Sequence, residues 1–335
     1  MKIILADDVF TGEPTYRRAL HKILSAVAEG RHRIEVDEGA LESWLEFQEA
    51  GLAADYRQGF RNSLRLAREE PADIATVEVV SDSEPSWADP VARLPLEQAA
   101  RLLAEPLGLL LENFEHDKDF LTAHLPPWLA RELDLQIKEG WVLVLNGGGS
   151  VLGAHLDERA DDRVRCLRTW IMFDSDRLHP DEHDPNWDGK APSGRDASCQ
   201  ALKWERTCSE IYPRRFWALH RRSIENYMPE NELENSPSQE LDHLDRVSAF
   251  TRMSRDQRWH FNMKKGRNGD TTEPACSRAR DLYAALPEPD KLLLQGGFGR
   301  NLSDQFKAAK QRPFAWDNDA RVEATLALSD LLRLL

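Results

Sequence analysis

LGLLLEN, residues 107–113, and VRCLRTWIMFDSD, residues 164–176, are two apolar stretches that end in acidic side chains. A short apolar run bounded by turn residues is typical of a strand buried on both faces of a parallel sheet. Between them, GWVLVLNGGGS at 140–150 is a third such run, and it leads into three glycines. Because helical periodicity separates these runs, they predict an α/β domain with a parallel sheet.

Alternating strands and helices are also predicted before and after these three runs. Strands are predicted at 1–10 and 72–82, and helices at 14–28, 39–70 and 94–105. On the other side, residues 115–138 carry a helical pattern interrupted by prolines, and 214–229 reads as a fourth strand that turns into a helix. Residues 177–198 are polar and rich in turn residues, so we expect a long exposed loop there.

The predicted organisation therefore has three parts. The parts are an α/β N-terminal domain with a regulatory or partner-binding role at 1–104, a catalytic domain at 105–235, and a mostly helical C-terminal extension at 236–335 that closes on an amphipathic helix. The fold class that we expect is α/β throughout the first two parts.

Composition limits the class of protein. The chain has 335 residues, 41% of them hydrophobic and 30% charged, which is typical of a globular protein with a substantial core. No apolar stretch is long enough to span a membrane, and the N-terminus lacks the features of a signal peptide, so we expect a cytoplasmic protein without a membrane partner. The four cysteines form no CxxC pair, which argues against a structural zinc.

The formal net charge of −14 affects the choice of function. Proteins that bind nucleic acid without sequence preference usually carry a basic balance, because phosphate neutralisation drives their affinity. Local basic patches, a bound metal or a partner protein would have to supply that contact here. The charge is compatible with a metal-dependent nuclease, since its carboxylates add negative charge by necessity.

Three acids fall at predicted strand ends. Glu112 closes the first strand of the second domain, and Asp174 and Asp176 close the third. The carboxyl ends of parallel strands meet at one edge of a sheet, where ligands bind. Residues i and i+2 of a strand face the same side, so Asp174 and Asp176 could share a cation, and Mg²⁺ prefers such oxygen ligands. The alternative is that these acids are solvated residues at the start of loops.

Four stretches of the chain resemble the Toprim domain, in the version found in OLD-family and related bacterial defence nucleases. They are LLLENFEHDKDFL at 109–121, VLNGGGS at 144–150, WIMFDSDR at 170–177 and RRSIENYMP at 221–229. The resemblance covers roughly 107–230 and implies a compact α/β fold with a Glu on its first strand and a DxD on its third. One departure is Asn113, where the family usually has Gly after the Glu.

The resemblance implies roles for five acids. Glu112 would act as a general acid/base or a metal ligand, and Asp174 and Asp176 would hold Mg²⁺ or Mn²⁺, so all three are catalytic candidates. Asp117 would bind a second metal, although it could equally cap the helix that follows. Glu225 would also bind a second metal, although it could instead cap a helix or pair with a neighbouring arginine.

The substrate would meet the basic side chains and the glycines. HFNMKKG at 260–266 resembles a lysine-bearing segment of these nucleases, and Lys265 there could stabilise the transition state. Glycines 147–149 could approach a phosphate through backbone N–H groups, or simply form a tight turn. The predicted nucleic-acid-binding residues are Arg177, Arg221, Arg222, Lys264 and Arg267, with a solvated surface as the alternative for each.

The sequence thus predicts a metal-dependent nuclease that cleaves DNA or RNA, including tRNA. The chain contains no GxxxxGK[ST] motif, so the resemblance to OLD-like anti-phage effectors implies a separate ATPase or sensor protein as partner. A homo-oligomer stays open. The alternative function is a non-hydrolytic Toprim scaffold, or a module for nucleic-acid binding or signalling. KIILADD at 2–8 resembles the start of a receiver domain, but Asp55 lies in a helical pattern and not at a strand end.

Overall fold

The computed structural model describes residues 1–11, 14–67, 74–81, 84–88, 91–148, 151–184, 186–187, 199–237, 241–273, 275–310 and 312–335. Gly149 of the predicted glycine turn and residues 188–198 of the predicted loop lie outside the described residues, as do the ends of the helix predicted at 39–70 and of the strand predicted at 72–82. Among the described residues, no helix is long and apolar enough to cross a membrane.

The N-terminal part of the chain forms a four-stranded parallel sheet. Its strands are β1 (Lys2–Leu5), β2 (Arg33–Glu35), β3 (Thr76–Val80) and β4 (Val91–Pro95), in the order β2-β1-β3-β4. Its helices are η1 (Asp7–Phe10), α1 (Pro14–Ala28), α2 (Glu38–Leu45), α3 (Ala50–Ala67) and α4 (Leu96–Ala104). The apolar residues of β3 are buried on both faces, which is what a central parallel strand requires.

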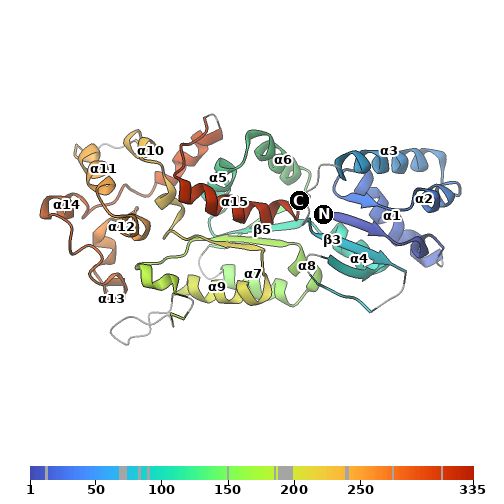
Figure 1. Cartoon of the computed structure of the whole chain (residues 1–335), viewed down its shortest axis with the longest axis horizontal. Helices are drawn as coiled ribbons and strands as arrows, with labels where there is room; N and C mark the ends of the chain where they lie inside the picture. Colours follow the sequence, from blue (N-terminus) through green and yellow to red (C-terminus); the bar gives the residue numbers. More distant parts are fainter. Residues whose placement is uncertain are drawn as a thin grey trace.

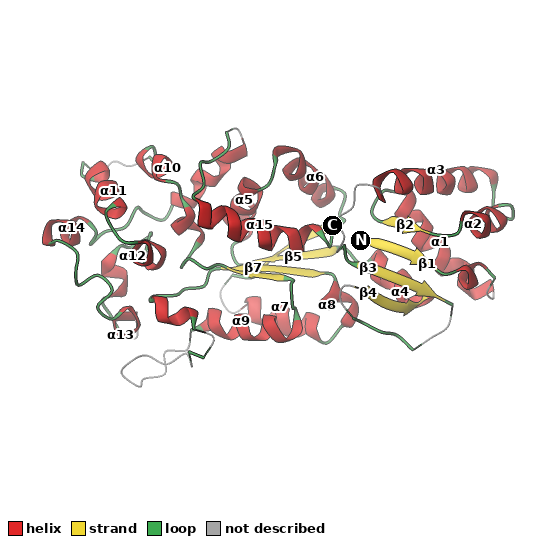
Figure 2. Ribbon diagram, in the orientation of Figure 1, coloured by secondary structure: helices red, strands yellow, loops and turns green. Residues whose placement is uncertain are grey.

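A second four-stranded parallel sheet follows. Its strands are β5 (Leu107–Leu111), β6 (Val142–Asn146), β7 (Thr169–Phe173) and β8 (Phe216–Ala218), in the order β6-β5-β7-β8. Its helices are α5 (Phe114–His124), α6 (Pro127–Lys138), α7 (Val151–Ala160), α8 (Arg163–Leu167) and α9 (Gln200–Ile211). Figure 2 shows α5 and α6 on one side of this sheet and α7, α8 and α9 on the other. The prediction of an α/β fold with parallel sheets is confirmed.

Several boundaries differ from the prediction. Residues 164–167 belong to α8 and not to the strand, because Asp162 caps a helix there by accepting a hydrogen bond from the backbone N–H of Val164 at 3.1 Å. The helical pattern at 39–70 is two helices, α2 and α3, and the strands β2 and β4 are additional. Strand β8 is followed by the short 3-10 helix η3 (Ile224–Tyr227) and not by an α-helix.

The predicted exposed loop after β7 is packed over its described first half. The 3-10 helix η2 (Pro180–His183) forms there, and Leu178 and Glu182 are buried. Glu182 stays in the interior because it accepts hydrogen bonds from Arg278 and from the backbone N–H of Leu178. A buried carboxylate with these partners is stable, whereas polarity alone suggested a solvated residue.

Beyond residue 229, the described part of the chain contains helices and no strand. They are α10 (Glu230–Glu234), α11 (His243–Thr251), α12 (Arg255–His260), η4 (Arg267–Asp270), α13 (Ala275–Ala279), α14 (Glu288–Leu293), η5 (Leu302–Lys310) and α15 (Asn318–Leu332). Figure 1 shows α10 to α14 beyond one end of the second sheet, while α15 runs back along that sheet toward the N-terminus.

Helix α15 joins the two sheets. The Glu323 carboxylate accepts hydrogen bonds from Trp217 Nε1 at 2.7 Å, from the His220 backbone N–H at 2.9 Å and from the Tyr227 hydroxyl at 2.6 Å. At the end of the chain, Arg168 Nη1 donates to the Leu334 carbonyl at 2.7 Å. One apolar cluster contains buried residues of both sheets and of α15, so the parts of the chain share a core.

An aromatic cluster links α5 to the segments on that side of the second sheet. Phe120 and His124 of α5 lie against Trp217, Tyr227 and Phe306, and the His124 ring stacks on Trp316 with ring centroids 3.9 Å apart. Burial, with the positive charge of Arg221 nearby, lowers the pKa of His124 to about 3 although Asp317 opposes the shift. The cluster fixes α5 relative to η3, and both carry residues of the candidate site.

We expect Glu323→Ala to destabilise the fold by about 2–4 kcal/mol, because it leaves the Trp217 and Tyr227 donors buried without a partner. Urea denaturation measures this change. Arg321→Ala is the matched control, since Arg321 is an exposed residue of the same helix. Equal stability of the two variants would contradict the role assigned to Glu323.

The His124 imidazole predicts a pH dependence of stability. Its folded-state pKa lies below the unfolded value of 6.5, so the unfolded chain binds the proton first as the pH falls. Stability should therefore decrease from about pH 6.5 downward, by up to about 1.4 kcal/mol per pH unit for this group. In His124→Phe, the free energy of unfolding should fall less steeply as the pH decreases below about 6.5. Measuring both proteins at pH 8 as well separates this effect from any change in packing.

Candidate active site at the carboxyl ends of the second sheet

The candidate site lies where the second sheet reverses its strand order. Strand β5 has β6 on one side and β7 on the other, and ligands of open α/β sheets bind outside the carboxyl ends at such a point. Glu112 directly follows β5, and Asp174 directly follows β7. Glu112 Oε2 accepts a hydrogen bond from the Asp174 backbone N–H at 3.0 Å, so the two residues lie side by side.

Two further acids enter from elements that pack beside these strand ends. Asp117 lies in the first turns of α5 and is buried, and its Oδ2 accepts from the Asn113 backbone N–H at 2.7 Å. Glu225 of η3 is 1% exposed and forms an ion pair with Lys264 at 3.2 Å. The Asp174 carboxylate connects the end of β7 to η3, because it accepts a hydrogen bond from the Ile224 backbone N–H at 3.1 Å.

These side chains line a cleft of about 500 Å³. Its lining combines the strand ends, α5, η3 and the C-terminal region. The residues are Glu112, Asn113, His116, Asp117, Gly148, Asp174, Ile224, Glu225, Lys264, Lys265, Arg300 and Ser303. The cleft thus has an acidic floor on the second sheet and a basic wall supplied by residues beyond 260.

Burial raises the pKa values of the acids in the cleft, and their mutual repulsion adds to the shift. Burial, with the Asp176 charge next in weight, raises the pKa of Glu112 to about 7 although the Asp174 N–H opposes the shift. Burial raises the pKa of Asp117 to about 8, and the Asn113 N–H opposes this. Burial and the neighbouring Glu112 also raise the pKa of Asp174 well above its usual range. Ionisation of each acid beside the others therefore destabilises the folded protein, unless a positive charge compensates.

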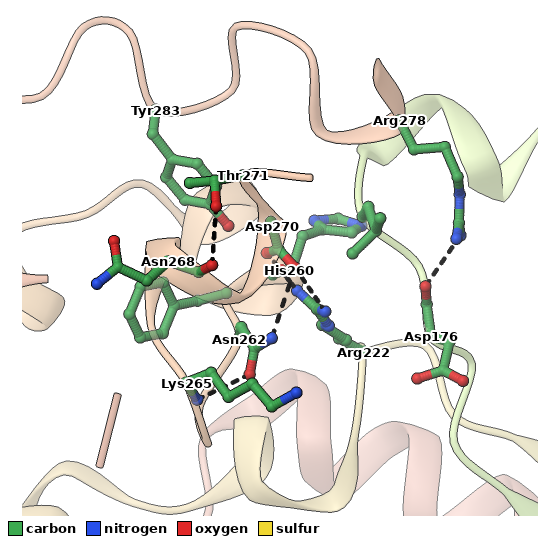
Figure 3. Close-up of polar contacts among 12 residues, drawn as sticks. Asp176, Arg222, His260, Asn262, Lys265, Asn268, Asp270, Thr271, Arg278 and Tyr283 are labelled. Carbon is green, nitrogen blue, oxygen red and sulfur yellow. Dashed lines mark hydrogen bonds and ion pairs between the residues drawn. The ribbon is translucent and has the colours of Figure 1, made fainter. Parts of the chain in front are cut away.

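Lys264, and not Lys265, lies against the acids. Burial lowers the pKa of the Lys264 ammonium, but Glu225 and Asp174 outweigh it, and the net shift is upward. Lys264 therefore stays charged as the fixed cation of the cleft. Lys265 is an exposed residue of the cleft wall whose backbone N–H donates to Asn262 Oδ1 at 2.9 Å (Figure 3).

Asp176 was expected to face the same side as Asp174, at the end of one strand, and its conformation differs from that expectation. Strand β7 ends at Phe173, and Asp176 has a φ of +51°, so strand alternation does not set its direction. Its backbone is held on both sides, with its N–H donating to the Arg222 carbonyl and its carbonyl accepting from Arg278. Figure 3 shows its carboxylate turned away from Arg278. Asp176 does not line the cleft that Asp174 lines, although its charge acts on Glu112.

The arginines predicted to bind nucleic acid are engaged within the protein. Arg177 is buried and donates to both oxygens of Glu205. Arg221 is buried and donates to both oxygens of Asp317. Both guanidinium groups thus already have carboxylate partners within the protein, and a role for these two arginines in binding nucleic acid stays a prediction.

Two other predicted basic residues also have internal partners. Arg222 donates to both oxygens of the buried Asp270, as Figure 3 shows, and so joins the segment before η3 to η4. Arg267 donates to the Lys291 carbonyl at 3.3 Å and lines a separate pocket in the C-terminal region. Of the six basic residues predicted for substrate contact, only Lys264 and Lys265 line the cleft.

The glycines after β6 permit close packing at the strand ends. A Cβ on Gly147 would lie 2.7 Å from Leu152 Cδ1, and one on Gly148 would lie 3.3 Å from the Glu112 carbonyl. Gly147 also donates to the Leu111 carbonyl at 2.6 Å. Gly148 therefore lets the backbone approach the cleft beside Glu112.

The donor set fits a divalent cation that prefers oxygen. Among the described residues, no group of three His, Cys, Asp or Glu side chains is close enough together to hold a metal ion in the present conformation. Glu225 Oε2, however, is buried and has no hydrogen-bond partner among the described residues. A buried carboxylate oxygen without a donor is costly, and a cation would satisfy it. Mg²⁺ or Mn²⁺ would be held by Glu225, Asp174 and Glu112, the carboxylates that line the cleft at the two strand ends and η3.

Sequence reasoning missed the part of the cleft that comes from residues beyond 290. Arg300 and Ser303 lie about 190 positions after Glu112, and only the fold brings them together. The signal that could have found Arg300 is its place in GGFGRNL, a glycine-rich run around a cation. His116 was also missed, although it lies one position before Asp117.

Comparison of the chain with protein-family models, with curated proteins and with solved structures gives no match.

Glu112→Gln and Asp174→Asn each keep a hydrogen-bonding oxygen and remove one negative charge. In EDTA, we expect both variants to melt at or above the wild-type temperature, because repulsion among the acids decreases. Mg²⁺ or Mn²⁺ should stabilise the wild type, by about 2.7 kcal/mol at a hundred-fold excess over Kd, and the variants much less. Differential scanning fluorimetry measures both effects.

The matched control for these two variants is Glu115→Gln, since Glu115 is an exposed carboxylate on α5 close to the cleft. It should respond to the metals as the wild type does. An unchanged metal response in Glu112→Gln and Asp174→Asn would show that these acids do not bind the cation.

Proposed function

We propose that the chain is a metal-dependent nuclease of the Toprim type that hydrolyses phosphodiester bonds of DNA or RNA. The observation that carries this proposal is the convergence of Glu112, Asp117, Asp174 and Glu225 on one cleft together with Lys264. The acids come from two parallel strand ends, from α5 and from η3, so separate parts of the sequence supply one site.

The charge distribution of the cleft suits a phosphodiester. A bound divalent cation would activate water and stabilise the leaving oxygen in phosphoryl transfer. Without positive charge, the acidic floor would repel a phosphate, so substrate and metal are expected to bind together. Lys264 is held by Glu225 and faces the same cleft, where its ammonium can stabilise negative charge that develops on the phosphate oxygens.

Glu112 is the acid that we assign to proton transfer. Its carboxylate accepts a hydrogen bond from the Asp174 backbone N–H, whereas Glu225 is paired with a lysine. It lies at the end of the central strand β5, which is buried at all five positions and therefore rigid. A carboxylate so placed can accept a proton from the attacking water while the bond between phosphorus and the leaving sugar oxygen breaks.

The Toprim resemblance supports the proposal at the matching positions. Glu112 follows the first strand of the second sheet, and Asp174 and Asp176 follow the third strand in chain order. A separate ATPase or sensor as partner, and a role in anti-phage defence, rest on the resemblance and belong to the same proposal. The net charge of −14 favours a nuclease that is brought to its substrate by such a partner.

The proposal is tested by incubating the full chain with plasmid DNA, single-stranded DNA and tRNA, with Mg²⁺, Mn²⁺ or EDTA. We expect cleavage of at least one substrate that depends on the divalent cation and falls by about a hundred-fold or more in Glu112→Gln, Asp174→Asn and Lys264→Met. Glu115→Gln should cleave as the wild type does.

The same experiment separates the proposal from the non-hydrolytic alternative. A protein that gains thermal stability with Mg²⁺ or Mn²⁺ but cleaves none of the three substrates would favour the scaffold function. Cleavage that persists in the Asp174→Asn variant would place the reaction elsewhere in the molecule.

A further inference from the structure

Two cations at the mouth of the acidic cleft have no partner in the described part of the chain. Lys265 and Arg300 both line the cleft and are exposed, and neither side chain takes part in an ion pair or hydrogen bond among the described residues. Figure 3 likewise draws no contact to the side-chain nitrogen of Lys265. The other lysine of the cleft, Lys264, is paired with Glu225.

The absence of internal partners sets these two residues apart from the arginines nearby. Arg221, Arg222 and Arg278 each bind a carboxylate of the protein. Lys265 and Arg300 line the same cleft as the acids and are exposed to solvent, and no ion pair joins either of them to an acid among the described residues. Exposed cations at the rim of an acidic cleft are suited to hold an anion that extends beyond the cleft.

Glycines fix the spacing between the two cations. Lys265 precedes Gly266, which has a φ of +66°, and a Cβ on Gly266 would lie 2.2 Å from the carbonyl carbon of Gly296. A Cβ on Gly297 would lie 2.5 Å from the Met263 carbonyl oxygen. The turn 263–266 and the loop 296–299 therefore lie backbone against backbone, a contact that side chains at these positions would prevent.

Hydrogen bonds and apolar anchors hold this pair of segments. The Phe298 backbone N–H donates to the Met263 carbonyl at 2.7 Å, and the Phe298 ring lies against Phe250 and Phe261. On the far side of Arg300, Leu302 is buried in the core. Arg300 is thus an exposed residue between two anchored ones, on a loop that packs against the turn that carries Lys265.

We propose that Lys265 and Arg300 form a clamp for a nucleic-acid backbone phosphate that flanks the phosphate in the acidic cleft. The inference rests on the proposed nuclease function, and it assigns part of the substrate binding to the C-terminal region. Arg300 presents a planar guanidinium that can bind two phosphate oxygens, and Lys265 adds a point charge. The clamp binds a strand next to the reacting bond without contributing to the acid cluster.

The experiment measures binding and cleavage for Lys265→Gln, Arg300→Gln and the double variant of the full chain. Binding of a fluorescent single-stranded or duplex oligonucleotide is followed by anisotropy across a series of KCl concentrations, with Ca²⁺ as an oxygen-binding divalent cation in place of Mg²⁺ and again in EDTA. Lys203→Gln is the matched control, because Lys203 is an exposed lysine of α9 that does not line the cleft.

We expect each clamp variant to bind the oligonucleotide about three- to ten-fold more weakly and to lower the slope of log affinity against log salt by about 0.7–0.9. KM should rise while kcat stays within about two-fold of the wild type, because the clamp grips substrate and transition state alike. The stabilisation by Mg²⁺ or Mn²⁺ should not change, since the acids remain intact.

The outcomes separate the clamp from the nuclease. If the wild type cleaves and both variants bind as Lys203→Gln does, the clamp is wrong and the nuclease stands. If the variants lose binding but no divalent cation supports cleavage, the clamp stands and the nuclease is wrong. If no oligonucleotide binds, the clamp proposal is overturned. It is also overturned if a mononucleotide binds in a way that depends on Lys265 and Arg300 while an oligonucleotide does not, because the ligand is then not a nucleic-acid strand.

Discussion

Repulsion among buried carboxylates is the constraint on which the rest of this site depends. Glu112, Asp117 and Asp174 have raised pKa values because burial and mutual proximity penalise their charge, and the fold holds them together nevertheless. Backbone N–H groups and Lys264 compensate in part. The remaining deficit of positive charge is a local instability that a bound divalent cation can relieve.

The scaffold around the acids is built to resist that repulsion. Strand β5 is buried at every position, and the aromatic cluster joins α5 to η3, so Asp117 and Glu225 cannot separate easily. Helix α15 adds the Glu323 contacts behind the same elements. Rigid support of this kind lets a binding site keep unfavourable charge that a flexible loop would release.

A chain of net charge −14 that binds a polyanion, as we propose, has to bind it through a few local cations. Arg177, Arg221 and Arg222 pair with carboxylates of the protein and so join segments that are distant in sequence. The cations left at the cleft are therefore few and fixed in place. Binding of this kind is local and depends on position, whereas a general basic surface would attract nucleic acid anywhere along its length.

Sequence alone determined the parallel strands ending at Glu112 and Asp174 and the helices between them, because apolar runs and helical periodicity are local properties. It also located the acids at one sheet edge, since parallel strands require it. The left-handed backbone of Asp176, the burial of Arg177 and Arg221, and the placement of Lys265 and Arg300 in one cleft were decided by tertiary structure. Each depends on partners far away in the chain, such as Arg278, Asp317 and Gly297, and no local pattern encodes which distant partner a polar side chain will meet.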